Sequence, residues 1–171
     1  SDNEIQGLPV LRKQAERLAR KEAFFHWHLE FPKVFFKEDG FDCLLGNPPW
    51  DKIEIEEREF FAVSAPEIAS KDTQSKRREL ISELEDTNPE LYKKYQQRVK
   101  RIESRTRFAK ESGRFKLTGK GHLNTYALFA ELALDHINGQ GRSGVIIPTG
   151  ITTDYYTQDY CQKIVDEGNL I

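Results

Sequence analysis

The amino-acid sequence predicts an α/β fold with a parallel sheet. The first observation is the mostly apolar run Phe41–Leu45, which is short and bounded by glycine and proline, as expected for a buried strand. The second is a similar run, Ser143–Pro148, which follows the Gly-rich turn Asn138–Gly141. The third is an amphipathic helix predicted between them, Asn124–Ile137. Because a strand, a helix and a second strand form the unit of parallel sheets, we expect the two strands to pair.

The composition is that of a single folded domain. The chain has 171 residues, of which 37% are hydrophobic and 11% aromatic, and these values argue against disorder. We find neither a run of about 18 apolar residues nor a signal peptide, so we expect a soluble, cytoplasmic protein without a membrane partner. Cys43 and Cys161 make no disulfide framework, and Cys43 is predicted to be buried in its strand. The absence of methionine indicates an excised piece of a longer polypeptide.

Two further helices are predicted near the ends of the chain. Leu8–Trp27 has apolar residues at helical spacing, and Pro9 suits its first turn. Asp154–Gly168 has a capping Asp at its start and a Gly at its end. We expect Leu170–Ile171 to begin another strand.

A charged segment of about 70 residues separates the first strand from the second helix. Within it, helices at Gln74–Asp86 and Pro89–Lys110 are expected to pair as a hairpin, with Asn88 as the N-cap of the second. The side chains expected to be buried by this pairing are Leu80, Ile81 and Leu84. The predicted organisation is residues 1–50 with the first helix and strand, 51–120 with the helical insertion, and 121–171 with a helix, a strand and a final helix.

Positive charge is concentrated in the second hairpin helix and the loop after it. The whole chain has 26 basic and 28 acidic residues and a net charge of −2, yet residues 93–120 hold eleven Lys or Arg and two Glu. The apolar residues of this helix fall on one side, which leaves a broad basic face on the other. Such a face suits a polyanion, and a solvated helix surface is the alternative. The basic residues of this face are Lys93, Lys94, Arg98, Lys100, Arg101, Arg105 and Arg107.

The tetrapeptide Asn47-Pro48-Pro49-Trp50 stands directly after the first strand. Open α/β sheets bind their ligands at the carboxyl ends of the strands. The two prolines make a stiff turn without backbone donors, which leaves the Asn47 amide oxygen and the turn carbonyls as acceptors. With the flat ring of Trp50 beside them, these acceptors suit a planar group that carries an NH₂. An ordinary strand-ending turn, with Trp50 packed in a core, is the alternative.

The tetrapeptide resembles the Asp/Asn/Ser-Pro-Pro-aromatic motif of amino-methyltransferases. The string Phe25–Phe35, with Gly40–Asp42 and Gly46–Trp50, resembles the methylase part of type IIG restriction-modification proteins. Asn124–Phe129 and Gly141–Gly150 resemble the next helix and strand of that family. The resemblance implies a partial Rossmann-like methyltransferase sheet with a helical-hairpin insertion. It also implies methyl transfer from S-adenosylmethionine to N6 of an adenine flipped out of double-stranded DNA, within a restriction-modification system.

The resemblance implies a site in two parts. The catalytic residues would be Asn47, Pro48, Pro49 and Trp50, and those on the cofactor side Asn124, Tyr126 and Phe129. In the catalytic part, Asn47 and the Pro48 carbonyl orient the amine and Trp50 stacks on the base. The family's main cofactor loop, Asp/Asn-Pro-x-x-Gly-x-Gly, has no match in residues 1–42. We therefore expect this chain alone to be inactive and to act with the rest of its polypeptide.

Other functions stay open from the sequence. An RNA base or a protein glutamine is an alternative methyl acceptor, since families with Asn-Pro-Pro-aromatic motifs modify both. A non-catalytic DNA-binding or assembly piece is another, with the insertion as its working part. His26 and His28 have no third ligand and no nuclease pattern is found, so we predict no metal site. We expect an isolated piece to self-associate through exposed apolar surface.

Overall fold

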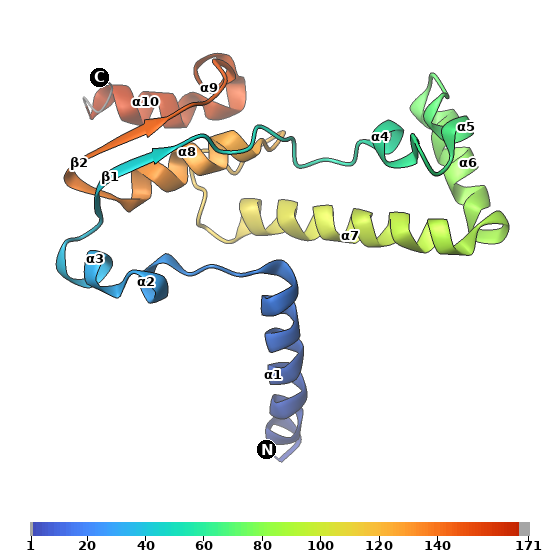
Figure 1. Cartoon of the computed structure of the whole chain (residues 1–171), viewed down its shortest axis with the longest axis horizontal. Helices are drawn as coiled ribbons and strands as arrows, with labels where there is room; N and C mark the ends of the chain where they lie inside the picture. Colours follow the sequence, from blue (N-terminus) through green and yellow to red (C-terminus); the bar gives the residue numbers. More distant parts are fainter. Residues whose placement is uncertain (1, 168–171) are drawn as a thin grey trace. The chain divides into compact units, whose positions relative to one another are not determined.

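The computed structural model describes residues 2–167, and the side chains of residues 9–167 (Figure 1). It divides into one unit of Ser1–Cys43 and Ile137–Gly141 and a second of Leu44–His136 and Arg142–Ile171. The elements in chain order are α1 (Asp2–Glu22), α2 (Trp27–Glu30), α3 (Pro32–Lys37), β1 (Phe41–Gly46), α4 (Glu57–Phe61), α5 (Pro66–Ala69), α6 (Gln74–Thr87), α7 (Pro89–Glu111), α8 (Thr125–His136), β2 (Ile137–Val145), α9 (Gly150–Thr153), the 3₁₀ turn η1 (Tyr155–Thr157) and α10 (Gln158–Asp166).

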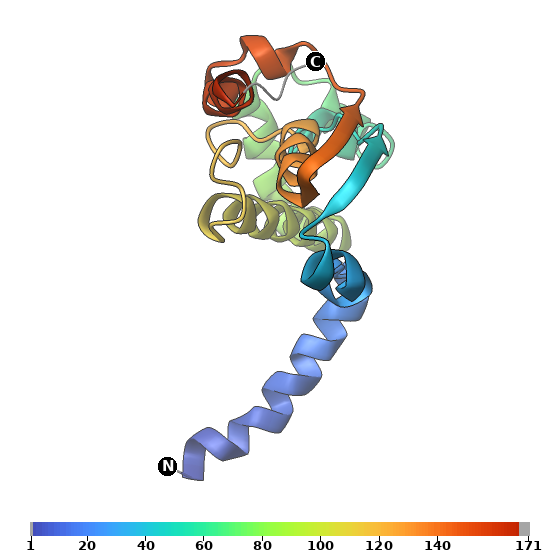
Figure 2. The same cartoon turned by 90° about the vertical axis from the view of Figure 1, so that its left-hand side faces the viewer.

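The strands β1 and β2 form a two-stranded parallel sheet (Figure 1 and Figure 2). Gly141 lies against Phe41, and five residues later the Ile146 amide donates to the Gly46 carbonyl at 3.0 Å, so both strands run in the same direction. The predicted pairing is thus confirmed. The expected turn at Asn138–Gly141 is wrong, because β2 begins at Ile137, directly after α8. Gly141 is needed in this strand because a Cβ there would lie 2.6 Å from the Phe41 carbonyl oxygen.

The prediction that β1 is buried is wrong for the structure described here. Leu45 is 78% exposed, and Cys43 is exposed as well. A parallel strand is buried when other strands and helices cover it on both edges and both faces, and the sheet of the described residues has two strands. The apolar character of β1 therefore exceeds what its neighbours in residues 2–167 cover.

The aromatic-rich segment before β1 folds into two short helices. Pro32 opens α3, and His28 lies in the helix α2 rather than in an extended segment. The rings of Phe31 and Phe35 each lie 5.4 Å from the ring of Phe41, in edge-on arrangements. These contacts attach the two short helices to the first residue of β1.

The first helix starts earlier and ends earlier than expected. Helix α1 runs from Asp2, so Pro9 lies inside it and removes one backbone hydrogen bond. It ends at Glu22 instead of Trp27 because Ala23 takes a left-handed conformation with φ of 50°. Leu11 and Leu18, on its predicted apolar side, are exposed.

Helices α4–α7 form a helical insertion with a core of its own. The predicted α6–α7 hairpin is confirmed: Ile81 and Leu84 are buried and Leu80 packs against them. Asn88 caps α7 as expected, since its side-chain oxygen accepts from the Leu91 amide at 3.2 Å. Phe61 of α4 is completely buried at the centre of this core. The insertion is therefore a small helical body, more than the two-helix hairpin that the sequence predicts.

A partly buried ion pair joins three helices of the insertion. Arg77 of α6 and Glu57 of α4 approach to 3.1 Å, and the Tyr95 hydroxyl of α7 donates to Glu57 at 3.3 Å. Burial, and then the neighbouring Glu57, raise the pKa of Tyr95 above its usual value. The sequence gave no signal for this pairing, because the three residues lie far apart along the chain.

The C-terminal helices pack on α8. Tyr126 and Ala130 of α8 form a core with Ile151 and Tyr160. Asp154 caps η1 by accepting from the Tyr156 amide at 3.0 Å, and α10 begins at Gln158, later than the helix predicted from Asp154. The predicted closing Gly168 and the strand expected at 170–171 lie outside the described residues.

Candidate functional site

The Asn47–Trp50 turn leaves the carboxyl end of β1 in an extended conformation. The Trp50 indole donates to the carbonyl of Ile146 at 3.2 Å, and Ile146 directly follows β2. The turn is thus attached to the carboxyl ends of both strands. This is the edge of the sheet at which the sequence placed it.

The start of α8 holds the other side of this turn. The Thr125 amide donates to the Asp51 carbonyl at 2.9 Å, and the Thr125 hydroxyl donates to the Pro49 carbonyl at 2.7 Å. The same hydroxyl accepts from the Asp51 amide at 3.0 Å. The following residues continue the contact, because Lys52 and Asn124 form an antiparallel bridge. Sequence analysis missed Thr125; a hydroxyl residue at a helix start was the available signal.

Two acceptors of the turn face no protein donor. Within residues 2–167, neither the Asn47 side chain nor the Pro48 carbonyl takes part in a hydrogen bond. Asn47 is exposed and Pro48 is half-buried. Trp50 is 52% exposed although its indole N–H is bonded, so a large part of its ring surface is accessible. The turn therefore presents two oxygen acceptors and an aromatic surface to a ligand.

A cavity of about 690 Å³ extends from Trp50 and Thr125 to α7. Helix α7 contributes Arg98, Ile102 and Arg105, which lie on one face of the helix at spacings of four and three residues. The opposite wall is the segment after the turn, with the acidic residues Glu54, Glu56 and Glu59. The turn and part of the basic face, which are far apart in the sequence, thus line one cavity.

The seven basic residues predicted for DNA are all exposed on α7. On its other side, Leu91, Tyr95 and Ala109 are buried, which confirms the predicted amphipathic arrangement. Ala109 also packs with Leu123 at the start of the α8 segment, so the end of α7 is fixed beside the residues that follow the turn. DNA contact by the basic face itself stays a prediction.

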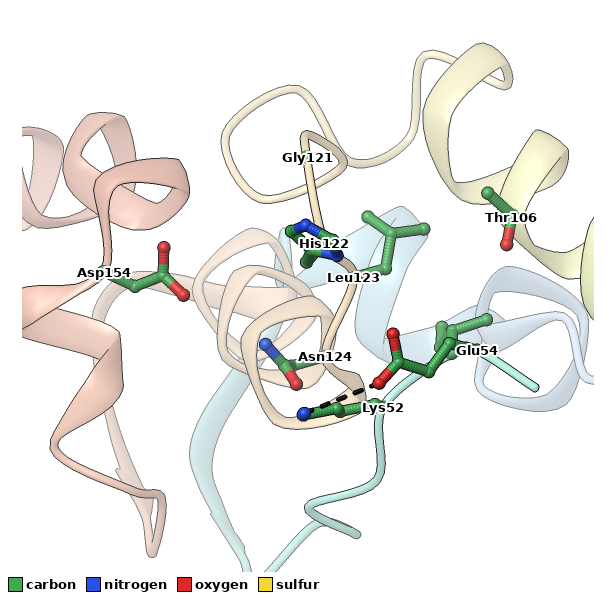
Figure 3. Close-up of a pocket in the computed structure, with 9 residues that line it drawn as sticks. Lys52, Glu54, Thr106, Gly121, His122, Leu123, Asn124 and Asp154 are labelled. Atoms are coloured by element: carbon green, nitrogen blue, oxygen red, sulfur yellow. Dashed lines mark ion pairs between the residues drawn. The ribbon is translucent and has the colours of Figure 1, made fainter. Parts of the chain in front are cut away.

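A smaller cavity of about 210 Å³ lies next to Asn124 (Figure 3). Its wall includes His122, Asp154 and the ion pair between Lys52 and Glu54, whose charged atoms are 3.5 Å apart. This cavity is polar on all sides, unlike the aromatic surface at Trp50. Of the three residues predicted for the cofactor side, Asn124 is the one that lines it.

Comparison with known proteins gives one match. Residues 2–80 match the Eco57I restriction-modification methylase family. This part of the chain is a methylase region of a restriction-modification protein. Neither the curated proteins nor the solved structures contain a significant match. The methylase region includes β1 and the whole Asn47–Trp50 turn, whereas α7 and Thr125 follow it in the sequence.

The methylase region does not fit S-adenosylmethionine by itself. Gly40 precedes β1, so it does not form a glycine-rich loop after a strand. Tyr126 is 7% exposed in a core, where burial raises its pKa, and Phe129 is 43% exposed. Together with Asn124 in the smaller cavity, these side chains do not converge on one ligand. The chemistry that the described residues support is that of the methyl acceptor.

Two further observations concern the part of the chain that the structure describes. Its residues contain no group of three or more His, Cys, Asp or Glu side chains placed to hold a metal ion. None of its helices is long and apolar enough to cross a membrane.

Proposed function

We propose that this chain forms the acceptor side of a DNA methyltransferase that modifies N6 of adenine. The observation that carries the proposal is the pair of unbonded acceptors, the Asn47 amide oxygen and the Pro48 carbonyl, beside the accessible ring of Trp50. The match of residues 2–80 to a restriction-modification methylase supports it. The two parallel strands with α8 between them support a Rossmann-like sheet of which β1 and β2 are members.

The proposed chemistry uses the acceptors to activate an amine. An adenine N6 amine has two protons, and donating one to Asn47 and the other to Pro48 matches the two oxygens of the turn. These hydrogen bonds draw the nitrogen lone pair out of conjugation with the ring, which makes the amine a better nucleophile. The base meanwhile stacks on Trp50. S-adenosylmethionine, which we propose as the methyl donor, supplies an electrophilic methyl group when it is bound.

The substrate proposed is double-stranded DNA with its target adenine flipped out, since N6 of a stacked base cannot reach the turn. The cavity supports a defined direction for the flipped nucleotide. Arg98 and Arg105 on α7 attract phosphate, whereas the acidic wall that carries Glu54 repels it. The DNA backbone would therefore follow α7, with the base directed toward Trp50. The predicted insertion, residues 51–120, is then the DNA-facing part of the chain.

The proposal is tested with the full-length protein that contains this chain. The protein is incubated with radiolabelled S-adenosylmethionine and, separately, duplex DNA, RNA and total protein, and the labelled product is digested and separated. We expect label in N6-methyladenine from DNA. Label in RNA or in glutamine would favour the alternative acceptors. DNA binding without transfer to any acceptor would favour a non-catalytic binding piece and contradict the proposal.

A further inference from the structure

The Pro-Pro turn cannot fix its own conformation through backbone hydrogen bonds. Pro48 and Pro49 have no N–H groups, so two successive peptide units lack the donor that normally anchors a turn. Their two carbonyl groups also differ in the structure. The Pro49 carbonyl accepts from Thr125 at 2.7 Å, and the Pro48 carbonyl has no partner among residues 2–167.

The Thr125 hydroxyl is fully used in this contact. A hydroxyl has one proton to donate, and Pro49 at 2.7 Å is the nearer of its two acceptors, since the Asp51 carbonyl lies at 3.1 Å. Its lone pair accepts from the Asp51 amide at 3.0 Å. One side chain thus fixes the backbone on both sides of Trp50, whose indole is bonded to Ile146.

We propose that Thr125 is a positioning residue, which holds the Pro49 carbonyl away from the amine site so that Asn47 and Pro48 remain its two acceptors. This inference rests on the proposed function. An amine with two protons is activated when both hydrogen bonds align with its lone pair, and a turn that rotates about Pro49 moves the Pro48 carbonyl out of alignment. Loss of the hydroxyl therefore affects the chemical step more than the binding of DNA.

The structure predicts that Thr125→Val removes this function without unfolding the site. The backbone contacts between the Thr125 amide and the Asp51 carbonyl, at 2.9 Å, and between the Ile53 amide and the Leu123 carbonyl, at 2.9 Å, do not depend on the side chain. Valine has nearly the shape of threonine, so the packing at the start of α8 is retained. Thr125→Ser keeps the hydroxyl and is expected to restore function.

The experiment measures single-turnover methylation and DNA binding by the full-length protein. Thr125→Val is expected to lower the rate of the chemical step about 10- to 100-fold, with the Kd for DNA changed by less than about twofold. Thr125→Ser is expected to stay within about threefold of the unmodified protein. The matched control is Thr152→Val, which removes an exposed hydroxyl bonded to the Thr149 carbonyl at 2.9 Å. DNA with 2-aminopurine at the target position reports flipping by its fluorescence, and this signal is expected to persist in Thr125→Val.

The outcomes separate this inference from the proposed function. A rate for Thr125→Val equal to that of Thr152→Val, or a Thr125→Ser protein as slow as Thr125→Val, would overturn the positioning role. A parallel loss of DNA binding and flipping would show a structural role instead. If the valine variant is less stable in thermal unfolding, Thr125→Ala provides the same loss of the hydroxyl with a smaller side chain. An unmodified protein that methylates no adenine would refute the proposed function itself.

Discussion

Replacement of Asn47 by alanine separates chemistry from binding in this site. The Asn47 side chain is exposed and has no hydrogen-bond partner within the described part of the chain. Its removal therefore breaks no contact that stabilises the fold, and we expect the free energy of unfolding to change by less than about 0.5 kcal/mol. If Asn47 has a role, that role concerns a bound ligand.

The expected size of the effect follows from the number of acceptors. The amine site has two oxygens, and Asn47→Ala leaves the Pro48 carbonyl alone. Loss of one preorganised hydrogen-bonding partner of a reacting group lowers kcat by about 10²- to 10³-fold, which corresponds to roughly 3–4 kcal/mol. DNA affinity depends mainly on phosphate contacts at other residues, so the Kd for DNA is expected to change less than about twofold.

The assay is single-turnover methylation of a duplex by the full-length protein, with Kd measured by fluorescence anisotropy on the same duplex. Gln74→Ala is a matched control, since it removes an exposed side-chain amide at the start of α6. Its rate is expected to equal that of the unmodified protein. An Asn47→Ala protein with the rate of Gln74→Ala would refute the amine-activation argument. A large increase in Kd would show that Asn47 contributes to DNA binding instead.

Three further predictions test the insertion. Arg98→Gln and Arg105→Gln, at the cavity wall, should each weaken DNA binding more than Lys93→Gln and reduce the slope of log K against log salt by about 0.9; equal effects at all three positions would argue against the cavity as the phosphate path. Arg77→Met leaves its partner carboxylate partly buried, with side-chain exposures of 13% and 10% in the pair, and should cost about 3 kcal/mol in urea unfolding; a cost below about 1 kcal/mol would contradict this role. Because folding raises the pKa of Tyr95, its stabilising contribution is complete below its unfolded pKa of 10.0 and is lost as the pH rises through the higher folded value. Unfolding followed from pH 8 to pH 11 should therefore show a smaller alkaline loss of stability in Tyr95→Phe, and identical pH profiles would contradict the assignment.

Features that depend on neighbours in the sequence could be predicted before the structure was known. The start of α7 follows from Asn88 and Pro89, which act within one turn of the helix. The position of the Asn47–Trp50 turn follows from the apolar strand that precedes it. The early end of α1 was missed, because no residue type in the sequence marks the left-handed conformation of Ala23.

Features that depend on distant residues were not predictable. Thr125 contacts Pro49 across 76 positions, and Trp50 contacts Ile146 across 96. The sequence showed these residue types, but a threonine at a helix start normally caps its own helix. Its use as a clamp on another segment depends on where β1 and α8 lie in the fold.

The sequence by itself determined the chemical character of the site: two prolines without donors, an amide oxygen, an indole ring and a separate basic helix. These properties are local, because they are set by covalent structure and by helical periodicity. The tertiary structure decided which turn carbonyl remains accessible and which arginines share a cavity with Trp50. Both depend on packing between segments far apart in the chain, since a hydrogen bond or a cavity wall is defined by distances in space that no residue spacing fixes.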